Sequence, residues 1–408
     1  MKQRNFPIMT VSKKAEAAIL GGHPWVYDTE VTERSDTVQD GDLVDVVTAG
    51  GKYLGTGFFN RNSKIRIRLI SRNANDTFDP AFFRRRFQYA WAYRKAVMGA
   101  DIDACRIIFG EADQFPGLTV DRFGDILVTQ TLSLGIEQRK NMLFPLLIDV
   151  LRQDGQQIRG IYERNDVAIR AHEGLSENKG FFPLKGEELP DSTTTEITEN
   201  QIRYRVDFEN GQKTGFFLDQ KYNRRAVAKL AKGRRVLDCF THTGSFALNA
   251  AMGGAESVHA VDISADAVAM AEFNARLNGL ENRIRFQTAN VFDLLPELEK
   301  QPRGQYDMII LDPPAFTKSR QTVSNAMRGY KEINLRAMRL LPRGGYLATC
   351  SCSHFATDDL FRDMLRHAAS DAGVALRQIE ARQQAPDHPI LWNVPETDYL
   401  KFYLFQIV

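Results

Sequence analysis

Three acidic side chains and a thiol follow short apolar runs in the C-terminal half of the sequence. Asp238, Asp262 and Asp312 each end such a run, and Cys352 follows another. The carboxyl ends of parallel strands meet at one edge of a sheet, where open α/β proteins bind their ligands. Carboxylates there repel phosphate and attract a cation, and a thiolate can attack an electrophilic carbon. The pattern predicts a site for a cationic ligand beside a nucleophile.

The loop after Asp238 narrows the choice of ligand. A dinucleotide-binding fold would present Gly-x-Gly-x-x-Gly, whose bare N–H groups hold a pyrophosphate. Only Gly244 of that pattern is present, which disfavours a dehydrogenase. S-adenosylmethionine (SAM) carries an ammonium and a sulfonium group, and its ribose hydroxyls could bind Asp262. We therefore expect SAM, although an ordinary strand capped by an Asp would look the same locally.

The sequence Asp312-Pro-Pro and Cys352 predict the chemistry. The two prolines stop the strand and hold the carboxyl group at the sheet edge, where it could bind the edge of a nucleobase; a plain break between strand and loop is the alternative. If the two strands are neighbours, Cys352 lies near Asp312 and could attack C6 of a pyrimidine, so that C5 accepts a methyl group. The alternative is a reduced structural cysteine, as we expect for Cys105 and Cys239. No second ligand pair accompanies Cys350 and Cys352, so we expect no metal site.

Length and composition limit the number of domains and the possible location of the protein. A chain of 408 residues with 43% hydrophobic residues is expected to form two or three domains. The net charge of +2 leaves nucleic-acid affinity to local patches. Four cysteines make no disulfide framework, and neither a signal peptide nor a membrane-length apolar run is apparent. We expect a cytoplasmic protein with no membrane association.

Three domains must position these groups, with predicted boundaries at residues 1–73, 74–193 and 194–408. The first is β-rich, with a helix capped by Ser12 and a hairpin over 41–59. In the strand 64–69, Lys64, Arg66 and Arg68 share one face. This row could line an RNA backbone, or it could simply be a solvated face.

The other two domains are read from hydrophobic periodicity. The central one is predicted to be α+β, with a helix beginning at Asp79-Pro80, a second helix over 136–151 and short strands that include 161–162 and 167–169. In the last domain a hairpin over 196–208 precedes alternating strands and helices. This alternation predicts an α/β, Rossmann-like mixed sheet of about seven strands.

Several motifs together resemble a known family. The segment Gly-Gly-His-Pro-Trp-Val-Tyr27 and the strands after it look like a PUA domain, a small β-barrel that binds RNA. The most specific marks farther along are Lys213-Thr-Gly-Phe-Phe-Leu-Asp219, Asp238-Cys-Phe-Thr-His-Thr-Gly-Ser245, Leu311-Asp-Pro-Pro-Ala-Phe316, Ser351-Cys-Ser353 and Pro386-Asp-His-Pro389. The whole chain resembles the PUA-domain family of bacterial large-subunit ribosomal RNA cytosine-C5 methyltransferases, with a class I SAM-dependent catalytic domain.

The resemblance implies methyl transfer from SAM to C5 of a cytosine in 23S rRNA, with a covalent bond between Cys352 and C6. It places Asp312 at the target base, Asp238 and Gly244 at the methionine part of SAM, Asp262 at the ribose and Asn290 at the adenine. The expected cofactor site is completed by these further residues: Phe217, Asp219, Phe240, Thr243, Ile263, Val291 and Asp312 itself.

One departure from the family pattern stands out. Many RNA cytosine-C5 enzymes carry a second Cys after the Pro of the fourth-strand motif to help release product, where this chain has Pro314 and Ala315. Two other readings stay open: an rRNA guanine N-methyltransferase with no covalent step, and a non-catalytic RNA-binding assembly protein. The sequence also leaves open which nucleotide is the target and whether the chain forms a homodimer.

Overall fold

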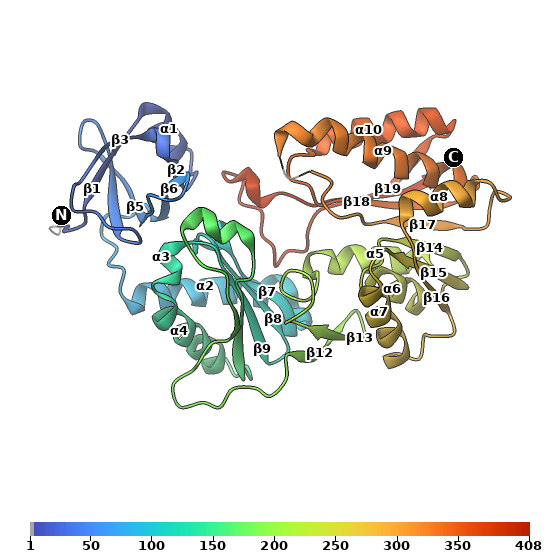
Figure 1. The fold of residues 1–408 in the computed structure, drawn as a ribbon, viewed down its shortest axis with the longest axis horizontal. Coiled ribbons are helices and arrows are strands. Elements are labelled where there is room, and N and C mark those ends of the chain that lie inside the picture. The colour runs from blue at the N-terminus through green and yellow to red at the C-terminus, as the bar shows by residue number, and fades with distance from the viewer. Residues whose placement is uncertain (1–3, 318) are drawn as a thin grey trace. The chain divides into compact units, whose positions relative to one another are not determined.

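The computed structural model describes residues 4–317 and 319–408, and the chain forms two compact units (Figure 1). One unit comprises Met1–Ile197, Val206–Leu218 and Pro386–Thr397, and the other comprises Thr198–Arg205, Asp219–Ala385 and Asp398–Val408. The division at residues 73 and 193 into three domains stays a prediction. Among the described residues, none of the helices has both the length and the apolar composition needed to cross a bilayer.

The first unit begins with a mixed six-stranded sheet in the order β2-β6-β5-β4-β1-β3. Its elements are β1 (Ile8–Val11), α1 (Lys13–Leu20), β2 (Trp25–Tyr27), β3 (Val31–Arg34), β4 (Leu43–Thr48), β5 (Tyr53–Phe59) and β6 (Ile65–Ser71). Ser12 caps α1 by accepting a hydrogen bond from Ala15 N–H, and β4 pairs with β5 as an antiparallel hairpin, as the sequence predicts. Alternating apolar residues such as Met9, Val26 and Ile67 fill the core of this sheet.

The same unit contains a five-stranded sheet in the order β11-β10-β9-β8-β7. Its elements are α2 (Pro80–Met98), β7 (Ala104–Phe109), β8 (Leu118–Phe123), β9 (Ile126–Thr131), α3 (Leu134–Glu137), α4 (Lys140–Gln153), β10 (Gly160–Arg164) and β11 (Lys179–Phe181). Asp79 caps α2, with Pro80 in the first turn, and the helix packs against α4 and β7.

One prediction for this region is confirmed with an interruption, and another is wrong. The expected helix over 136–151 is present but divided: α3 ends at Glu137 and α4 begins at Lys140, and between them the side chains of Gln138 and Arg139 donate to the carbonyl groups of Asp40 and Gly41. The expected strand over 167–169 is a 3-10 helix, Ala168–Glu173, whose buried Arg170 donates to Thr131 O and Ser176 O. In both places side chains donate to carbonyl groups outside the predicted element, which the local apolar pattern does not reveal.

The second unit is built on a seven-stranded sheet in the order β16-β15-β14-β17-β18-β20-β19. Its strands are β14 (Arg235–Cys239), β15 (Ser257–Asp262), β16 (Ile284–Thr288), β17 (Met308–Leu311), β18 (Tyr346–Ser351), β19 (Leu376–Arg382) and β20 (Lys401–Ile407). The first five are parallel, and β20 runs antiparallel between β18 and β19. The expected mixed Rossmann-like sheet is confirmed. A separate two-stranded hairpin, β12 (Thr194–Glu199) with β13 (Ile202–Asp207), forms where the sequence predicts one.

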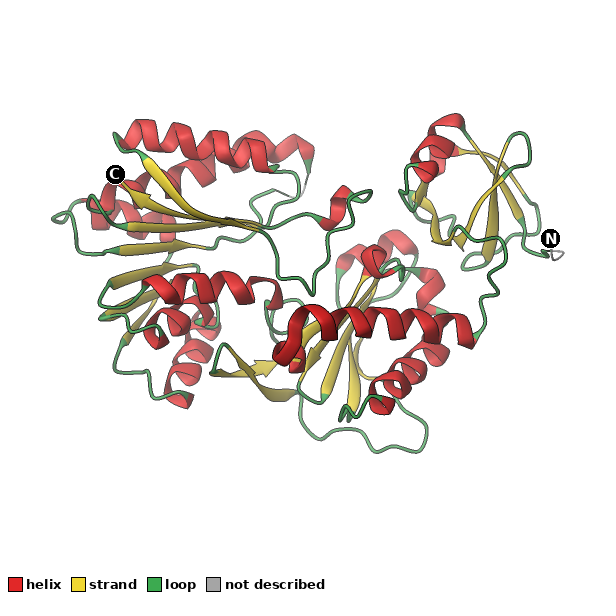
Figure 2. Cartoon of the chain, turned by 180° about the vertical axis from the view of Figure 1, so that it is seen from behind, coloured by secondary structure: helices red, strands yellow, loops and turns green. Residues whose placement is uncertain are grey.

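Helices cover both faces of the seven-stranded sheet (Figures 1 and 2). One layer contains α5 (Lys221–Leu230), α6 (Ser245–Met252) and α7 (Ala265–Leu277), and the other contains α8 (Val291–Glu299), α9 (Val323–Leu340) and α10 (Asp358–Ala372). Central strand residues such as Leu237, Ile309 and Leu347 are fully buried between these layers. Because β14, β15, β17 and β18 are parallel, their carboxyl ends present their polar residues at one edge.

Candidate functional site at the strand ends

Asp238 lies near the carboxyl end of the central strand β14 and is fully buried. Its Oδ2 accepts a hydrogen bond from Thr241 Oγ1 at 2.6 Å. Burial, reinforced by the nearby charge of Asp312, raises the pKa of Asp238 to about 7. The backbone N–H of Ala247 in the following helix also favours the ionised form, but Oδ1 accepts no hydrogen bond of good geometry within the described part of the chain.

The loop between β14 and α6 has an unusual backbone. Phe240, His242 and Gly244 all have a positive φ, at 65°, 51° and 83°. A Cβ on Gly244 would lie 2.9 Å from the Cβ of Ala271, so glycine is required there for both conformation and space. In the same loop the buried Thr243 Oγ1 also lacks a hydrogen-bond partner among the described residues. The left-handed backbone conformations of Phe240 and His242 are strained, and they hold this loop close to Asp238.

Asp262 ends β15, and its carboxylate is fixed by two backbone donors. His242 N–H donates to Oδ2 and Ser264 N–H to Oδ1, both at 2.9 Å. The next residue, Ile263, is an aliphatic side chain that is 70% exposed. Each carboxylate oxygen keeps a lone pair for a hydroxyl, so Asp262 offers polar binding beside an apolar surface.

Asn290 follows β16 as the cap of α8, where its side chain accepts from Phe292 N–H at 3.1 Å and donates to Asp293 at 3.0 Å. Val291, the first residue of α8, is buried. The Asn290 amide is thus oriented by its own helix.

Asp312 follows β17 directly, in the loop where Pro313 and Pro314 come next. Gln220 Nε2 donates to its Oδ1 at 2.9 Å. Burial, together with the carboxylate of Asp219, raises the pKa of Asp312 to about 7. Asp219 itself accepts a hydrogen bond from Tyr399 Oη at 2.6 Å. A carboxyl group with this pKa is about half protonated at neutral pH and can donate as well as accept.

Cys352 follows β18, the neighbour of β17, with Leu311 opposite Thr349 in the parallel register. Its Sγ lies 3.9 Å from Pro313 O, in the loop that Asp312 opens. Cys352 is partly accessible, whereas Cys350 is buried against Asp312 and Gln220 with a pKa well above its usual value. The predicted proximity of β17 and β18 is confirmed, and of the two thiols the accessible one is Cys352.

Lys401 is a nearly buried cation in the same region, with a 7% exposed fraction. Its Nζ donates to Ser353 O at 2.7 Å and Tyr399 O at 2.9 Å. Burial lowers the pKa of Lys401 to about 8, and the charge of Cys352 acts in the opposite direction. The ammonium group therefore interacts electrostatically with the thiolate form of Cys352.

The residues present fit a cationic ligand such as SAM. Asp238, Asp262, Asp219 and Asp312 all belong to the second unit, and burial raises the pKa of Asp238 and of Asp312, so their ionised forms are costly. A ligand that brings positive charge would relieve this cost. Among the described residues, Asp238 Oδ1 and Thr243 Oγ1 are buried atoms without a hydrogen-bond partner that such a ligand could engage.

Four predicted site residues belong to the first unit: Phe217, Lys64, Arg66 and Arg68. Phe217 belongs to the first unit, where Lys213 Nζ lies 4.9 Å from its ring centroid, and its expected role in cofactor binding stays a prediction. Lys64 is exposed, and Arg66 donates to Asn60 O. Arg68, by contrast, is only 12% exposed and pairs with two carboxylates of the same unit, Glu111 and Glu173.

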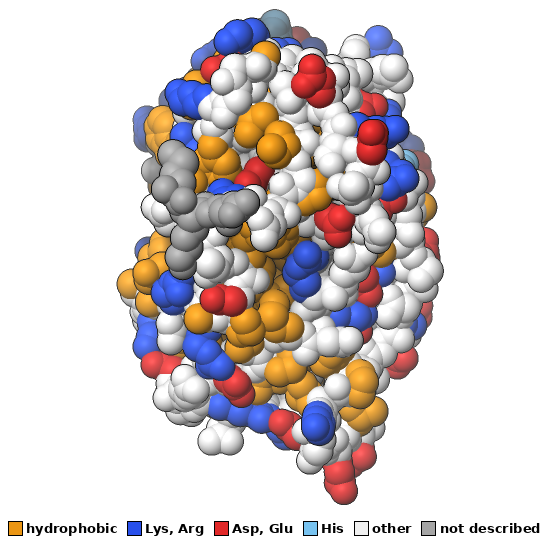
Figure 3. Space-filling model, turned by 90° about the vertical axis from the view of Figure 1, so that its left-hand side faces the viewer, with side chains coloured by type: hydrophobic (Ala, Val, Ile, Leu, Met, Phe, Trp, Pro, Cys, Tyr) orange, Lys and Arg blue, Asp and Glu red, His pale blue; other side chains and the backbone are white. Residues whose placement is uncertain are grey.

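The RNA-binding role of the row Lys64, Arg66 and Arg68 stays a prediction. The ion pairs of Arg68 reduce the charge that this residue can offer to a phosphate. On the face drawn in Figure 3, Lys and Arg side chains are interspersed with Asp and Glu and with apolar residues. The mixed charges of this face agree with the near-neutral composition of the chain.

Sequence reasoning missed several residues that line the strand ends. Thr241, Gln220, Tyr399 and Lys401 all contact the predicted aspartates or the Cys352 segment. Thr241 could have been found from its place three residues after Asp238. The spacing of the motifs does not predict Tyr399 or Lys401, because Tyr399 lies in the loop before β20 and Lys401 begins that last strand.

Two family matches agree with this geometry. Residues 181–406 match the family described as S-adenosylmethionine-dependent methyltransferase, and residues 9–72 match a PUA-like domain. Proteins named "Ribosomal RNA large subunit methyltransferase I" are similar over nearly the whole chain. The one from Klebsiella pneumoniae is 38% identical over 405 residues (99% of each chain), and the one from Tolumonas auensis is 40% identical over 394 residues (96% of this chain and 97% of that one).

Solved structures share the fold. The crystal structure of SMU.776 complexed with SAH matches with a TM-score of 0.82 at 23% identity, covering 98% of this chain and 99% of that one. A SAM-dependent methyltransferase from Agrobacterium tumefaciens matches with a TM-score of 0.51 at 19% identity, covering 74% of this chain and 90% of that one.

Proposed function

The chain belongs to the family of S-adenosylmethionine-dependent methyltransferases, and from this premise we propose that it methylates C5 of a cytosine in 23S rRNA through a covalent bond between Cys352 and C6. The name shared by the full-length relatives supports large-subunit rRNA as the substrate. The PUA-like match over residues 9–72 supports RNA binding by the N-terminal sheet. The observation that carries the choice of atom is the accessible Cys352 thiol, 3.9 Å from Pro313 O and beside the loop of Asp312.

SAM, when bound, supplies an electrophilic methyl group. Asp238 and Thr243 are the residues that would hold its methionine part, Asp262 its ribose hydroxyls, and Ile263 and Asn290 its adenine. The fixed carboxylate of Asp262 and the oriented amide of Asn290 need little rearrangement to make such bonds. The chain thus binds and orients the donor at the ends of β14 and β15.

The remaining groups act on the base. C5 of cytosine is a weak nucleophile, and attack of the Cys352 thiolate on C6 moves an electron pair toward C5. Asp312, with a pKa of about 7, can donate a proton or a hydrogen bond to N3 and stabilise the electron-rich ring. Loss of the C5 proton to a base after methylation returns an electron pair to the ring and expels the thiolate.

Lys401 supports the nucleophile without contacting the reacting atoms. Its buried ammonium favours the anionic form of Cys352, because an uncompensated thiolate would be costly at this depth. The base must also reach the thiol, and a stacked or paired cytosine can do so only when it is turned out of its helix.

The proposal is tested with RNA that contains 5-fluorocytosine. Fluorine at C5 cannot leave as a cation, so the adduct with Cys352 persists and is seen as a slow-migrating protein–RNA band in a denaturing gel. We expect Cys352→Ala to lose this band and Cys350→Ala, a change of the neighbouring buried thiol, to keep it. A guanine N-methyltransferase would form no band with either protein.

The product is identified independently. After incubation of the protein and SAM with 23S rRNA from cells that lack it, nucleoside mass spectrometry is expected to find 5-methylcytidine. A methylguanosine product would refute the choice of atom, and no methylated nucleoside would refute the activity.

A further inference from the structure

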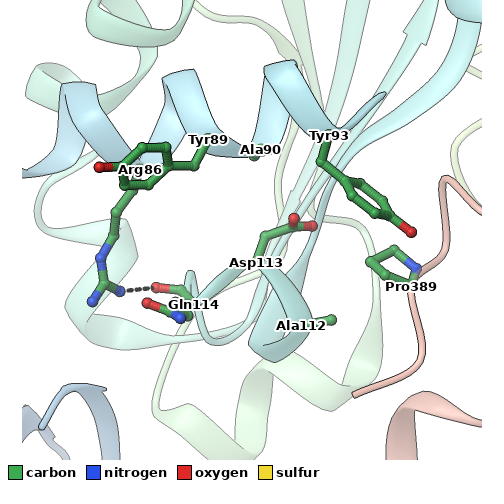
Figure 4. A pocket seen from close by; sticks show the side chains of 8 residues that line it. All are labelled: Arg86, Tyr89, Ala90, Tyr93, Ala112, Asp113, Gln114 and Pro389. Atoms are coloured by element: carbon green, nitrogen blue, oxygen red, sulfur yellow. Dashed lines mark hydrogen bonds between the residues drawn. The ribbon is translucent and has the colours of Figure 1, made fainter. Parts of the chain in front are cut away.

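The first unit contains a surface cavity that none of the residues discussed above explains. Its volume is about 250 Å³, and it is lined by one face of α2, by the turn Gly110–Asp113 with the residue after it, and by Pro389. Figure 4 shows Arg86 and Tyr93 projecting from α2 at either end of the cavity, with Ala90 between them. This size is below the usual range for drug-like ligands and suits a single flat ring.

Two tyrosines make this cavity unusual. Tyr89 is 71% exposed and Tyr93 is 38% exposed, although both belong to a helix whose other aromatic residues are buried. The hydroxyl of Tyr93 donates to Pro386 O at 3.0 Å, which fixes the ring while part of it stays accessible. Exposed, oriented aromatic rings are the surfaces on which proteins stack unpaired nucleobases.

Arg86 supplies a positive charge at the other end. Its guanidinium lies 4.3 Å from the Phe82 ring centroid and donates to Gln114 O at 2.7 Å, so its position is fixed. Within residues 4–317 and 319–408 it has no carboxylate at ion-pair distance. Burial lowers the pKa of Arg86 to about 10, which leaves it charged at neutral pH but poorly compensated. An anion at this position would therefore be favoured.

The carboxylate in the cavity wall does not cancel this charge. Asp113 is bound in two places by Arg94, which is itself fully buried, and it also accepts from Phe109 N–H. The Asp113–Arg94 pair is neutral as a unit, so Arg86 gives the cavity its net charge. An aromatic surface with one cation is complementary to a base with its phosphate.

We infer that this cavity binds one unpaired nucleotide of the RNA substrate, with the base stacked on Tyr89 and the phosphate on Arg86, while Tyr93 lies toward Pro389 at the other end. The inference rests on the proposed function, since it takes RNA as the substrate. The proposed contacts use a ring face and the backbone phosphate, so they would position RNA without selecting a base. It would hold a single-stranded segment, because a paired base cannot offer both faces to a protein ring.

The test uses the full-length protein and a short fluorescein-labelled single-stranded RNA containing 4-thiouridine. We expect Tyr89→Ala to weaken binding about tenfold, since one stacked base contributes on this scale, and Tyr89→Phe to bind like the wild type because it keeps the ring. Arg86→Gln is expected to weaken binding and to reduce the slope of log K against log salt by about one. Gln88→Ala, a change at an exposed position of α2 outside the cavity, serves as the matched control.

Photocrosslinking to the wild-type protein tests the inference without a substitution that could lower the stability of the fold. The 4-thiouridine crosslink is expected on the peptide that contains Tyr89 and Tyr93, and excess unlabelled single-stranded RNA should remove it more effectively than duplex RNA. Equal RNA affinity of wild type and Tyr89→Ala, or crosslinks only outside α2, would overturn the inference even if wild type methylates rRNA normally. If wild type neither binds nor methylates rRNA, the proposed function itself fails.

Discussion

Replacing Asp238 by Asn tests whether the buried carboxylate at the end of β14 is the group that receives positive charge from SAM. Burial raises the pKa of Asp238 from 3.8 to about 7. Near pH 6 such a group is about nine-tenths protonated in the free protein. If the ammonium group of SAM restores an ordinary carboxylate pKa, binding must release close to one proton from this residue.

The assay is isothermal titration calorimetry with SAM in buffers of different ionisation enthalpy. The number of protons released is the slope of the observed enthalpy against the buffer enthalpy. We expect Asp238→Asn to release about 0.9 proton fewer than the wild type near pH 6, and about 0.1 fewer near pH 8, where Asp238 is already ionised. Loss of a charged hydrogen bond should weaken SAM binding near pH 8 by about 10- to 100-fold, or roughly 1.5–3 kcal/mol.

The same substitution has an opposite effect on the protein without SAM. Folding raises the pKa of Asp238 from near 4 in the unfolded chain to about 7. The free energy of unfolding therefore falls as the pH rises between these two values. The full shift corresponds to ~4 kcal/mol as an upper bound. Asp238→Asn should therefore melt at a higher temperature than the wild type near pH 8 and lose this advantage near pH 4.

Asp359→Asn, the same change at an exposed position of α10, should leave proton release, SAM affinity and melting temperature unchanged. Equal proton release by wild type and Asp238→Asn near pH 6, with equal SAM affinity near pH 8, would refute the assignment of Asp238 to the cationic ligand.

Three further changes test the neighbouring groups. Cys352→Ala should reduce methylation of rRNA by at least about a thousandfold, as expected for loss of a nucleophile, while SAM binding measured by calorimetry stays within about twofold. Lys401→Met should slow alkylation of Cys352 by iodoacetamide near pH 7.5 by about tenfold, because the ammonium that favours the thiolate is removed; an unchanged rate would show that Lys401 has only a packing role. Gly244→Ala should lower the free energy of unfolding by about 2–4 kcal/mol, from left-handed strain plus the close contact with Ala271. Gly279→Ala, with a similar φ and open space around its Cβ, should cost only about 1 kcal/mol in the same urea titration.

The architecture of the second unit could be predicted because its local signals agree with one another. Apolar runs ending in Asp238, Asp262 and Asp312 mark three parallel strands, and the Pro-Pro and Gly residues after them mark the loops. Each strand is buried on both faces, so hydrophobicity alone identifies it. The departures are in the first unit, at the interruption before α4 and in the 3-10 helix Ala168–Glu173, where Arg139 and Arg170 donate to distant carbonyl groups. The hydrophobic pattern of a short segment contains no information about hydrogen-bond partners that are distant in the sequence.

The site also has features that the sequence predicts and features that only the packed structure reveals. Asp312 and Cys352 were placed together because neighbouring parallel strands bring their ends together, which is a rule of topology. Whether the carboxyl group can donate a proton and the thiol can ionise depends instead on Asp219, Tyr399 and Lys401. Burial sets the pKa of Asp312 and of Lys401 near neutrality, and burial is a property of the packed molecule. A mechanism that needs a protonated acid beside a thiolate therefore becomes arguable only when the fold shows which groups lose their water.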